Sequence, residues 1–143
     1  MSFVLDASVT LCWLFLDGKP AGRAYALKVL DAMMEARTSA LVPVTWALEV
    51  ANVLGKSEAK SLLTEAQSEA FLELLQGLDI GADPATFSRA FSDTLQLARR
   101  YRLSVYDASY LELAMRTGIP LATLDEDLKK AAGKAGLKRF AAA

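Results

Sequence analysis

An acidic residue in an apolar setting, Asp107 in the stretch VYDASYLELA, is the most unusual feature of this sequence. On a helix, Asp107 falls in the middle of an apolar face to which Tyr106 and Tyr110 belong. Both tyrosines are predicted to lie in the core or in an interface, and Glu112 and Arg116 on the opposite, solvent-exposed face. A carboxylate that points toward a core costs several kcal/mol unless a partner or a metal ion compensates for its charge. We therefore expect such a group opposite Asp107.

Three further acids are predicted to lie near Asp107. Asp6 directly follows the first strand-like run, and Asp125 closely follows the last run before the C-terminal helix. Ligands of parallel α/β sheets bind beyond such carboxyl ends. Glu49 lies beside an apolar stripe in the helix after the second strand. Each acid alone has an ordinary explanation, as a helix cap, a first-turn acid or a surface residue. Together they favour a shared site, in which the carboxylates would repel one another without a cation.

The composition restricts the chemistry of such a site. The chain has 143 residues and 53% hydrophobic content, enough for one domain with a substantial core. It contains no histidine, which removes serine–histidine and cysteine–histidine mechanisms, the usual zinc sites and the commonest general base. The single cysteine, Cys12, is predicted to be a buried thiol. Hydrolytic chemistry would have to use carboxylates, hydroxyls, amines or a metal ion held by oxygen ligands.

Charge and hydropathy bear on location. With a net charge of −1, the protein as a whole has no strong electrostatic attraction to nucleic acid or to membranes. The sequence has no apolar run near the length of a membrane span, and Met1 is not followed by the basic region of a signal peptide. We therefore expect a cytoplasmic protein without a membrane segment.

Short strand-like runs alternate with longer helical patterns along the chain. This alternation predicts an α/β fold, in which residues 1–140 form one domain with a mostly parallel sheet of four to five short strands and helices on both faces. The predicted strands are Phe3–Leu5, Ala40–Val42, Leu78–Ile80 and Pro120–Thr123, with Leu137–Phe140 as a last edge strand. The predicted helices cover residues 8–16, 20–36, 43–54, 65–78, 84–101, 105–117 and 126–136, and residues 141–143 are expected to fray.

Residues typical of helix ends support these boundaries. Thr64 begins a capping box, and Asp83 is predicted to cap the helix that starts at the following proline. Ser104 and Asp125 are candidate caps for the last two helices. Gly118 is expected to end the helix that carries the central acid of the site.

Four segments carry a resemblance to a known family. They are VLDASV, VPVTWALEVANVL, YRLSVYDASYLELAMRTGIPLATLD and DLKKAA, and they cover nearly the whole chain in order. These segments resemble the PIN-domain ribonucleases, and specifically the VapC-like toxins of toxin–antitoxin pairs. The resemblance implies a catalytic, metal-binding quartet of Asp6, Glu49, Asp107 and Asp125. Carboxylate oxygens of this kind select Mg²⁺ or Mn²⁺, here as one or two ions.

The same resemblance implies further contacts and partners. Four residues are predicted to support the acids or to touch the substrate: Ser8, Asn52, Thr123 and Asp127. Independently of the resemblance, the position of three arginines just before the Asp107 helix predicts contacts with RNA phosphates, although an ordinary helix-end cation is the alternative for at least one of them: Arg99, Arg100 and Arg102. The mean hydropathy of +0.24 suggests more apolar surface than one small core uses. An RNA substrate, a cognate antitoxin protein and a homodimer are therefore the expected partners.

Alternative functions make different demands on the same acids. A phosphoacceptor signalling domain is also α/β and binds Mg²⁺, but it would need paired acids after the first strand and a lysine after the last strand. A phosphatase of the haloacid dehalogenase type would need an aspartate at the position of Ser8. A catalytically silent interaction module with a PIN-like fold is a further interpretation, which the presence of all four acids disfavours.

Overall fold

A parallel four-stranded sheet forms the centre of the protein, which a computed structural model describes for residues 1–15, 17–35 and 37–141. The strands are β1 (Ser2–Leu5), β2 (Ser39–Val42), β3 (Ile80–Ala82) and β4 (Leu121–Ala122), in the order β3-β2-β1-β4. Val4 of β1 pairs with Leu41 of β2 and with Leu121 of β4. The predicted α/β fold with a parallel sheet is confirmed.

Helices fill the connections between the strands. They are α1 (Ala7–Cys12), α2 (Pro20–Met34), α3 (Thr45–Ala59), α4 (Glu65–Gln76), α5 (Thr86–Arg89), the π-helical turn η1 (Ala90–Thr94), α6 (Leu95–Tyr101), α7 (Val105–Thr117) and α8 (Glu126–Lys134). In the described part of the chain, no helix combines the length and the apolar character that crossing a membrane requires.

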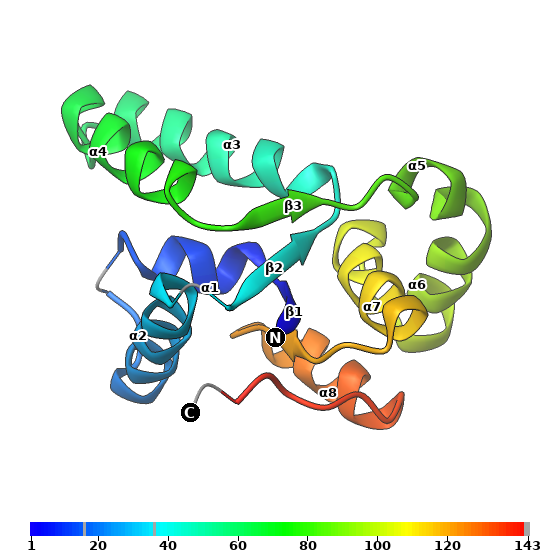
Figure 1. Cartoon of the computed structure of the whole chain (residues 1–143). Coiled ribbons are helices and arrows are strands. Elements are labelled where there is room, and N and C mark those ends of the chain that lie inside the picture. The colour runs from blue at the N-terminus through cyan, green and yellow to red at the C-terminus, as the bar shows by residue number, and fades with distance from the viewer. Residues whose placement is uncertain (16, 36, 142–143) are drawn as a thin grey trace.

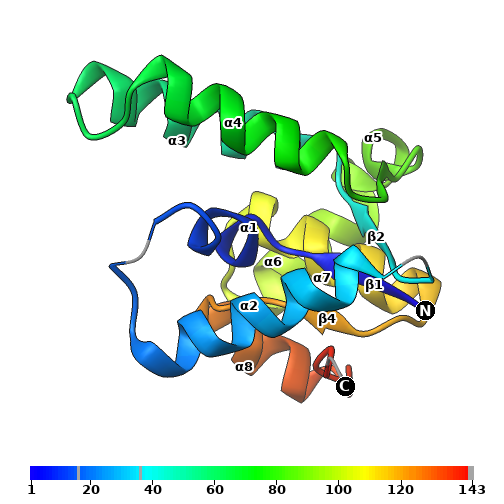
Figure 2. The ribbon, with the colours of Figure 1, turned by 60° about the vertical axis from the view of Figure 1, so that its left-hand side comes forward.

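The helices lie on both sides of the sheet (Figure 1). α1 and α2 lie on one side, whereas α5, α6 and α7 lie on the other. α3 and α4 run side by side as a helical hairpin in both views (Figures 1 and 2), and α1 packs against α3. α7 packs on β1 and β4 and also contacts α8. α7 is therefore close to the two strands that Asp6 and Asp125 follow.

The core lies around β1 and α7. The β1 residues Phe3, Val4 and Leu5 are fully buried, as expected for a central parallel strand covered on both faces. Tyr110 of α7 is also fully buried, as predicted. Tyr106 was predicted to lie in the core or in an interface, and it does not lie in the core, because its side chain is 63% exposed.

The C-terminal segment packs back onto the first strand. The ring of Phe3 stacks on that of Phe140, with 3.9 Å between the ring centroids. The predicted edge strand at residues 137–140 is wrong, because only an isolated bridge between Leu121 and Arg139 forms there. Stacking of Phe140 on Phe3 and this single bridge therefore attach the C-terminal segment to the sheet in place of a paired strand. Of the predicted frayed tail, residues 142 and 143 lie outside the described part of the chain.

Most predicted helix ends are confirmed by their capping contacts. Thr64 forms a capping box with Gln67. Ser104 Oγ accepts the Asp107 N–H at 3.1 Å, and Asp125 Oδ1 accepts the Leu128 N–H at 2.8 Å. Gly118, with φ at 69°, ends α7 in the left-handed region that glycine tolerates without a steric penalty.

Several boundaries differ from the predictions. α1 ends at Cys12, which is partly buried, and the predicted ends at residues 16 and 36 fall outside the described residues. α3 begins at Thr45 and continues to Ala59. β3 begins later than predicted because the Leu78 N–H still bonds to the last turn of α4. The single helix predicted over residues 84–101 starts at Thr86 and is divided by η1.

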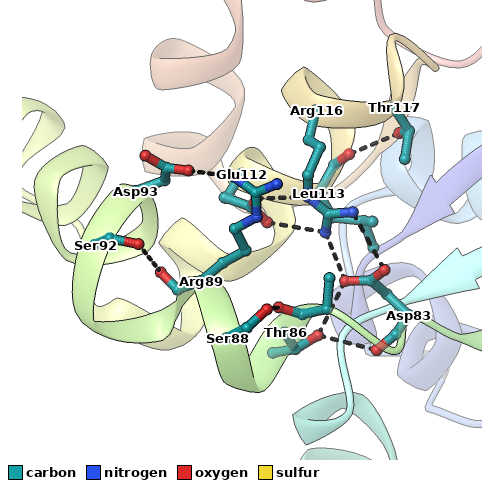
Figure 3. A network of polar contacts seen from close by, with 11 residues as sticks. Asp83, Thr86, Ser88, Arg89, Ser92, Asp93, Glu112, Leu113, Arg116 and Thr117 are labelled. Atoms are coloured by element: carbon teal, nitrogen blue, oxygen red, sulfur yellow. Dashed lines mark hydrogen bonds and ion pairs between the residues drawn. The ribbon is translucent and has the colours of Figure 1, made fainter.

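Arg116 forms ion pairs with two buried carboxylates, those of Asp83 and Glu112, and we call these three residues the Arg116 network (Figure 3). The predicted cap role of Asp83 and the predicted solvent exposure of Glu112 are both wrong. Arg116 Nη2 lies 2.6 Å from Asp83 Oδ2, and Arg116 Nε lies 2.7 Å from Glu112 Oε1. Asp83 therefore binds α7 and is not the N-cap of α5, which is Ala85. The face of α7 that carries Glu112 is buried because α6 and η1 pack against α7, so its carboxylate is paired and not solvated.

Candidate active site

Asp6 follows β1 and is held by two hydroxyl groups. Ser8 Oγ and Thr123 Oγ1 donate hydrogen bonds of 2.5 Å and 2.7 Å to Asp6 Oδ2. Leu124 N donates to Ser8 Oγ, and Asp125 N donates to Thr123 Oγ1. Asp6 is only 4% exposed, and burial raises the pKa of its carboxyl, whereas the two hydroxyls lower it. The carboxylate is thus fixed between two segments that are 117 residues apart in sequence.

Glu49 lies in the second turn of α3, which follows β2. The Tyr110 hydroxyl donates to Glu49 Oε2 at 3.3 Å, while Oε1 is buried without a hydrogen bond of normal geometry. Burial and then the negative charge of Asp6 raise the pKa of Glu49 to about 7. The Thr45 hydroxyl, which is likewise buried and unpaired, lowers the pKa of the Glu49 carboxyl but does not offset the effect of burial. Burial and the neighbouring charge therefore favour the protonated form of this carboxyl when no cation is bound.

The remaining two acids lie at helix N-termini. Asp107 is in the first turn of α7, and burial followed by the charges of Asp125 and Asp6 raises its pKa to about 6. Asp125 is the N-cap of α8. An N-cap carboxylate with one oxygen bound to the helix keeps its second oxygen available for another ligand.

Electrostatic repulsion connects all four acids. The charge of Asp125 acts on Asp6 and Asp107, and the charge of Asp6 acts on Glu49. Within residues 1–15, 17–35 and 37–141, these side chains do not form a ready-made set of three metal ligands. A divalent cation nevertheless fits the donor set, because it would satisfy the buried Glu49 Oε1 and offset the repulsion. Oxygen-only donors suit Mg²⁺ or Mn²⁺.

Comparison with known proteins identifies the family. The family model of the PIN domain matches residues 3–134 of this chain. The chain belongs to the PIN domain family. The curated protein ribonuclease VapC3 from Pyrobaculum aerophilum is 35% identical over 82 residues, which are 57% of this chain and 63% of that protein. The match thus spans less than two thirds of that relative, and it confirms the resemblance to VapC-like PIN domains.

A solved structure supports the same fold. The crystal structure of PAE2754 from Pyrobaculum aerophilum matches with a TM-score of 0.63 at 24% sequence identity. The match covers 92% of this chain and 87% of that one. The PIN domain architecture therefore extends over nearly all of the chain.

Two predicted site residues of this PIN domain lie on its surface. Asn52 is exposed on α3, one turn after Glu49. Asp127 is exposed in the first turn of α8, although its charge adds to the raised pKa of Asp107. Neither residue contacts the Asp6 carboxylate in the way that the predicted hydroxyl residues do.

The predicted RNA-contacting arginines are exposed at the end of α6. A cavity of about 530 Å³, the cationic notch, is lined by Arg100, Tyr101, Arg102 and Lys134. Arg102 is the C-cap of α6 and has a φ of 55°, which is uncommon for a residue other than glycine. Arg99 is exposed in the same turn. Sequence reasoning missed Lys134 because only the packed fold brings the end of α8 next to the end of α6.

Sequence reasoning also assigned Tyr110 to the core or an interface alone. Its ring is in the core of the PIN domain, but its hydroxyl contacts one of the four acids. The only signal in the sequence was its position one turn after Asp107 on the same helix.

Proposed function

We propose that this PIN domain is a metal-dependent endoribonuclease that hydrolyses RNA phosphodiester bonds, and that it is the toxin of a VapBC-type toxin–antitoxin pair. The observation that carries the proposal is the electrostatic coupling of four carboxylates, Asp6, Glu49, Asp107 and Asp125, one of which has a buried oxygen without a partner. Such an arrangement is unfavourable for the fold alone, and a bound cation would relieve it. The name of the relative, ribonuclease VapC3, supports RNA as the substrate.

The four acids are the proposed ligands, direct or through water, of one or two Mg²⁺ or Mn²⁺ ions. When bound, such an ion activates a water molecule and offsets the charge that develops on the phosphate. Glu49 can offer Oε1 without breaking a hydrogen bond. The hydrogen bonds from Ser8 and Thr123 restrain the orientation of the Asp6 carboxylate. These residues thus provide ligand oxygens in a largely prearranged form.

The cationic notch offers positive charge to the phosphates of an RNA strand. Arg100, Arg102 and Lys134 are proposed to bind phosphates of the substrate, with Arg99 at the border. The VapC name of the relative supports a cognate antitoxin protein as a second partner. Because the substrate is cellular RNA, the proposal places the protein in the cytoplasm.

A homodimer is proposed through an exposed apolar face around α5 and η1. The side chains of Phe87 and Phe91, four residues apart in this segment, are 89% and 93% exposed. A largely apolar cavity of about 210 Å³ is lined by their neighbours Thr86 and Ala90 and by Tyr106. A two-fold interface joins the same patch of both copies, and two exposed phenylalanines one helical turn apart offer apolar surface that such a contact would bury.

The oligomeric state tests this face directly. Phe91→Asp should convert a dimer into a monomer in size-exclusion chromatography with light scattering, because a charge would be buried at the contact. Leu62→Asp, at another exposed apolar side chain, is the matched control and should leave the dimer intact. A dimer that persists in Phe91→Asp would show that the copies meet elsewhere.

Cleavage of a total RNA pool tests the proposed activity. Wild-type protein with Mg²⁺ or Mn²⁺ should give discrete RNA fragments, and EDTA should abolish them. Asp107→Asn should lower the cleavage rate more than about 100-fold while circular dichroism shows an intact fold. Asp31→Asn, which changes an exposed aspartate of α2, is the matched control and should cleave like the wild type.

The two variants also separate the proposal from its competitors. Equal activity in Asp107→Asn and the wild type would refute the assignment of the acids. Transfer of a phosphoryl group to an aspartate, without RNA cleavage, would identify a phosphoacceptor domain instead.

A further inference from the structure

Tyr110 combines complete burial with a polar group that needs a partner. Its side chain is the largest among those fully buried in the described residues, and it lies one turn after Asp107 on α7. A buried hydroxyl without a hydrogen bond is costly, so phenylalanine would suit a purely apolar position better. The side chain that this hydroxyl contacts is Glu49, at 3.3 Å from Oε2.

The hydroxyl makes the two oxygens of Glu49 different. Oε2 accepts the Tyr110 hydrogen bond, and Oε1 is buried without a hydrogen bond of normal geometry, although the Thr45 hydroxyl also acts on this carboxyl. Without this hydrogen bond, the flexible side chain of Glu49 would sample several orientations, and the carboxylate oxygen that could bind the ion would differ among them. Burial and the negative charges of Asp6 and Glu49 raise the pKa of Tyr110 above its usual value, so the phenol remains a neutral donor near neutral pH.

We propose that Tyr110 is a positioning residue for the metal centre: its hydroxyl anchors Oε2 of Glu49 and keeps Oε1 available to the divalent ion. The inference rests on the proposed metal-dependent function, and Tyr110 itself touches neither the ion nor the RNA. α7 then contributes twice, because it carries Asp107 as a ligand and orients a second ligand that belongs to α3. Loss of a group that orients a metal ligand commonly weakens metal binding by about 10- to 100-fold.

The test is the affinity of the 143-residue chain for Mn²⁺, measured by titration calorimetry without RNA. Tyr110→Phe removes only the hydroxyl and should weaken Mn²⁺ binding by about 10-fold or more. Tyr25→Phe is the matched control, because the Tyr25 hydroxyl donates to the Phe140 carbonyl at 2.8 Å and its ring lies under Arg139. This control should bind Mn²⁺ as the wild type does.

A double-mutant cycle tests whether the effect runs through Glu49. Glu49→Gln should weaken Mn²⁺ binding, and adding Tyr110→Phe to it should cause less than about a 2-fold further loss. An equal further loss in both backgrounds would overturn the proposal, because Tyr110 would then act on another group. Circular dichroism and urea unfolding in EDTA show whether each variant keeps its fold.

The remaining outcomes are equally decisive. Tyr110→Phe with wild-type Mn²⁺ affinity overturns the positioning role and leaves the metal-dependent function standing. Wild-type protein that binds no Mn²⁺ overturns both. A Tyr110→Phe variant that is unfolded in EDTA shows that the hydroxyl serves the fold, which also overturns the positioning role.

Discussion

The stability of the metal-free protein should fall as the pH rises from 5 to 7. The chain has no histidine, so no side chain with an ordinary pKa titrates in this range. Glu49 and Asp107 do titrate there, because their pKa values are raised from 4.5 to about 7 and from 3.8 to about 6. The native state therefore binds more protons than the unfolded state. Because of this difference in bound protons, the free energy of unfolding falls as the pH rises toward and through the native-state pKa values.

The size of the effect follows from the two pKa shifts. One pKa unit corresponds to about 1.4 kcal/mol, Glu49 contributes over the whole range, and Asp107 contributes over its lower half. Because both side chains are partly open to solvent, screening should reduce the total by about half. We expect a loss of about 2 kcal/mol in the free energy of unfolding between pH 5 and pH 7. This corresponds to a decrease of about 1 M in the urea midpoint.

Urea unfolding followed by circular dichroism, in EDTA at pH 5, 6 and 7, measures this loss. Glu49→Gln should reduce the pH dependence by more than half, whereas Asp31→Asn, at an exposed position, should not change it. Saturating Mn²⁺ should reverse the sign, because the ion binds the deprotonated carboxylates of the native state. A wild-type midpoint that is constant from pH 5 to pH 7 in EDTA would refute the electrostatic coupling on which the site depends.

Two further predictions concern stability and use matched pairs. Arg116→Ala should lower the free energy of unfolding by about 3 kcal/mol or more, because it leaves two buried carboxylates without their ion-pair partner. Arg89→Ala, the matched control, removes an exposed ion pair and should lower it by less than about 1 kcal/mol. Equal losses in urea unfolding would show that the Arg116 network is solvated. A Cβ would meet no atom within 4 Å at either Gly118 or Gly133, so only the backbone and helix propensity distinguish the two sites. Gly118→Ala should lower the free energy of unfolding by about 1 kcal/mol because Gly118 has a positive φ. Gly133→Ala, inside α8, should raise it by about 0.5 kcal/mol because alanine favours the helix. Thermal unfolding distinguishes them, and the same sign for both would contradict the backbone argument.

The sequence was informative where one physical rule decides the outcome. The acids after strands, Asp6 and Asp125, were expected to lie near each other because parallel strands end at one edge of the sheet. Ser104 and Gly118 were recognised because capping depends on a few neighbouring residues. Local rules of this kind do not require knowledge of the packing.

The failures concern contacts between distant segments. Helical periodicity placed Glu112 and Arg116 in solvent, because it separates polar from apolar residues and cannot show that α6 and η1 cover the polar face. Asp83 was read as a cap because aspartate before proline is typical of one, although a long-range ion pair with α7 is its actual contact. Likewise, the partner of the Tyr110 hydroxyl lies 61 residues away and leaves no local pattern.

The hydrogen bond from Thr123 to Asp6 has a consequence for synthesis on the ribosome. A growing chain makes β1, Asp6 and Ser8 first, but the second hydroxyl that restrains this carboxylate, and the Leu124 N–H that holds Ser8 in place, come from a segment near the other end of the sequence. The carboxyl group would lack these contacts until β4 has left the exit tunnel and joined the sheet edge. Translation order alone thus keeps an incomplete product from having all four acids of the site in place.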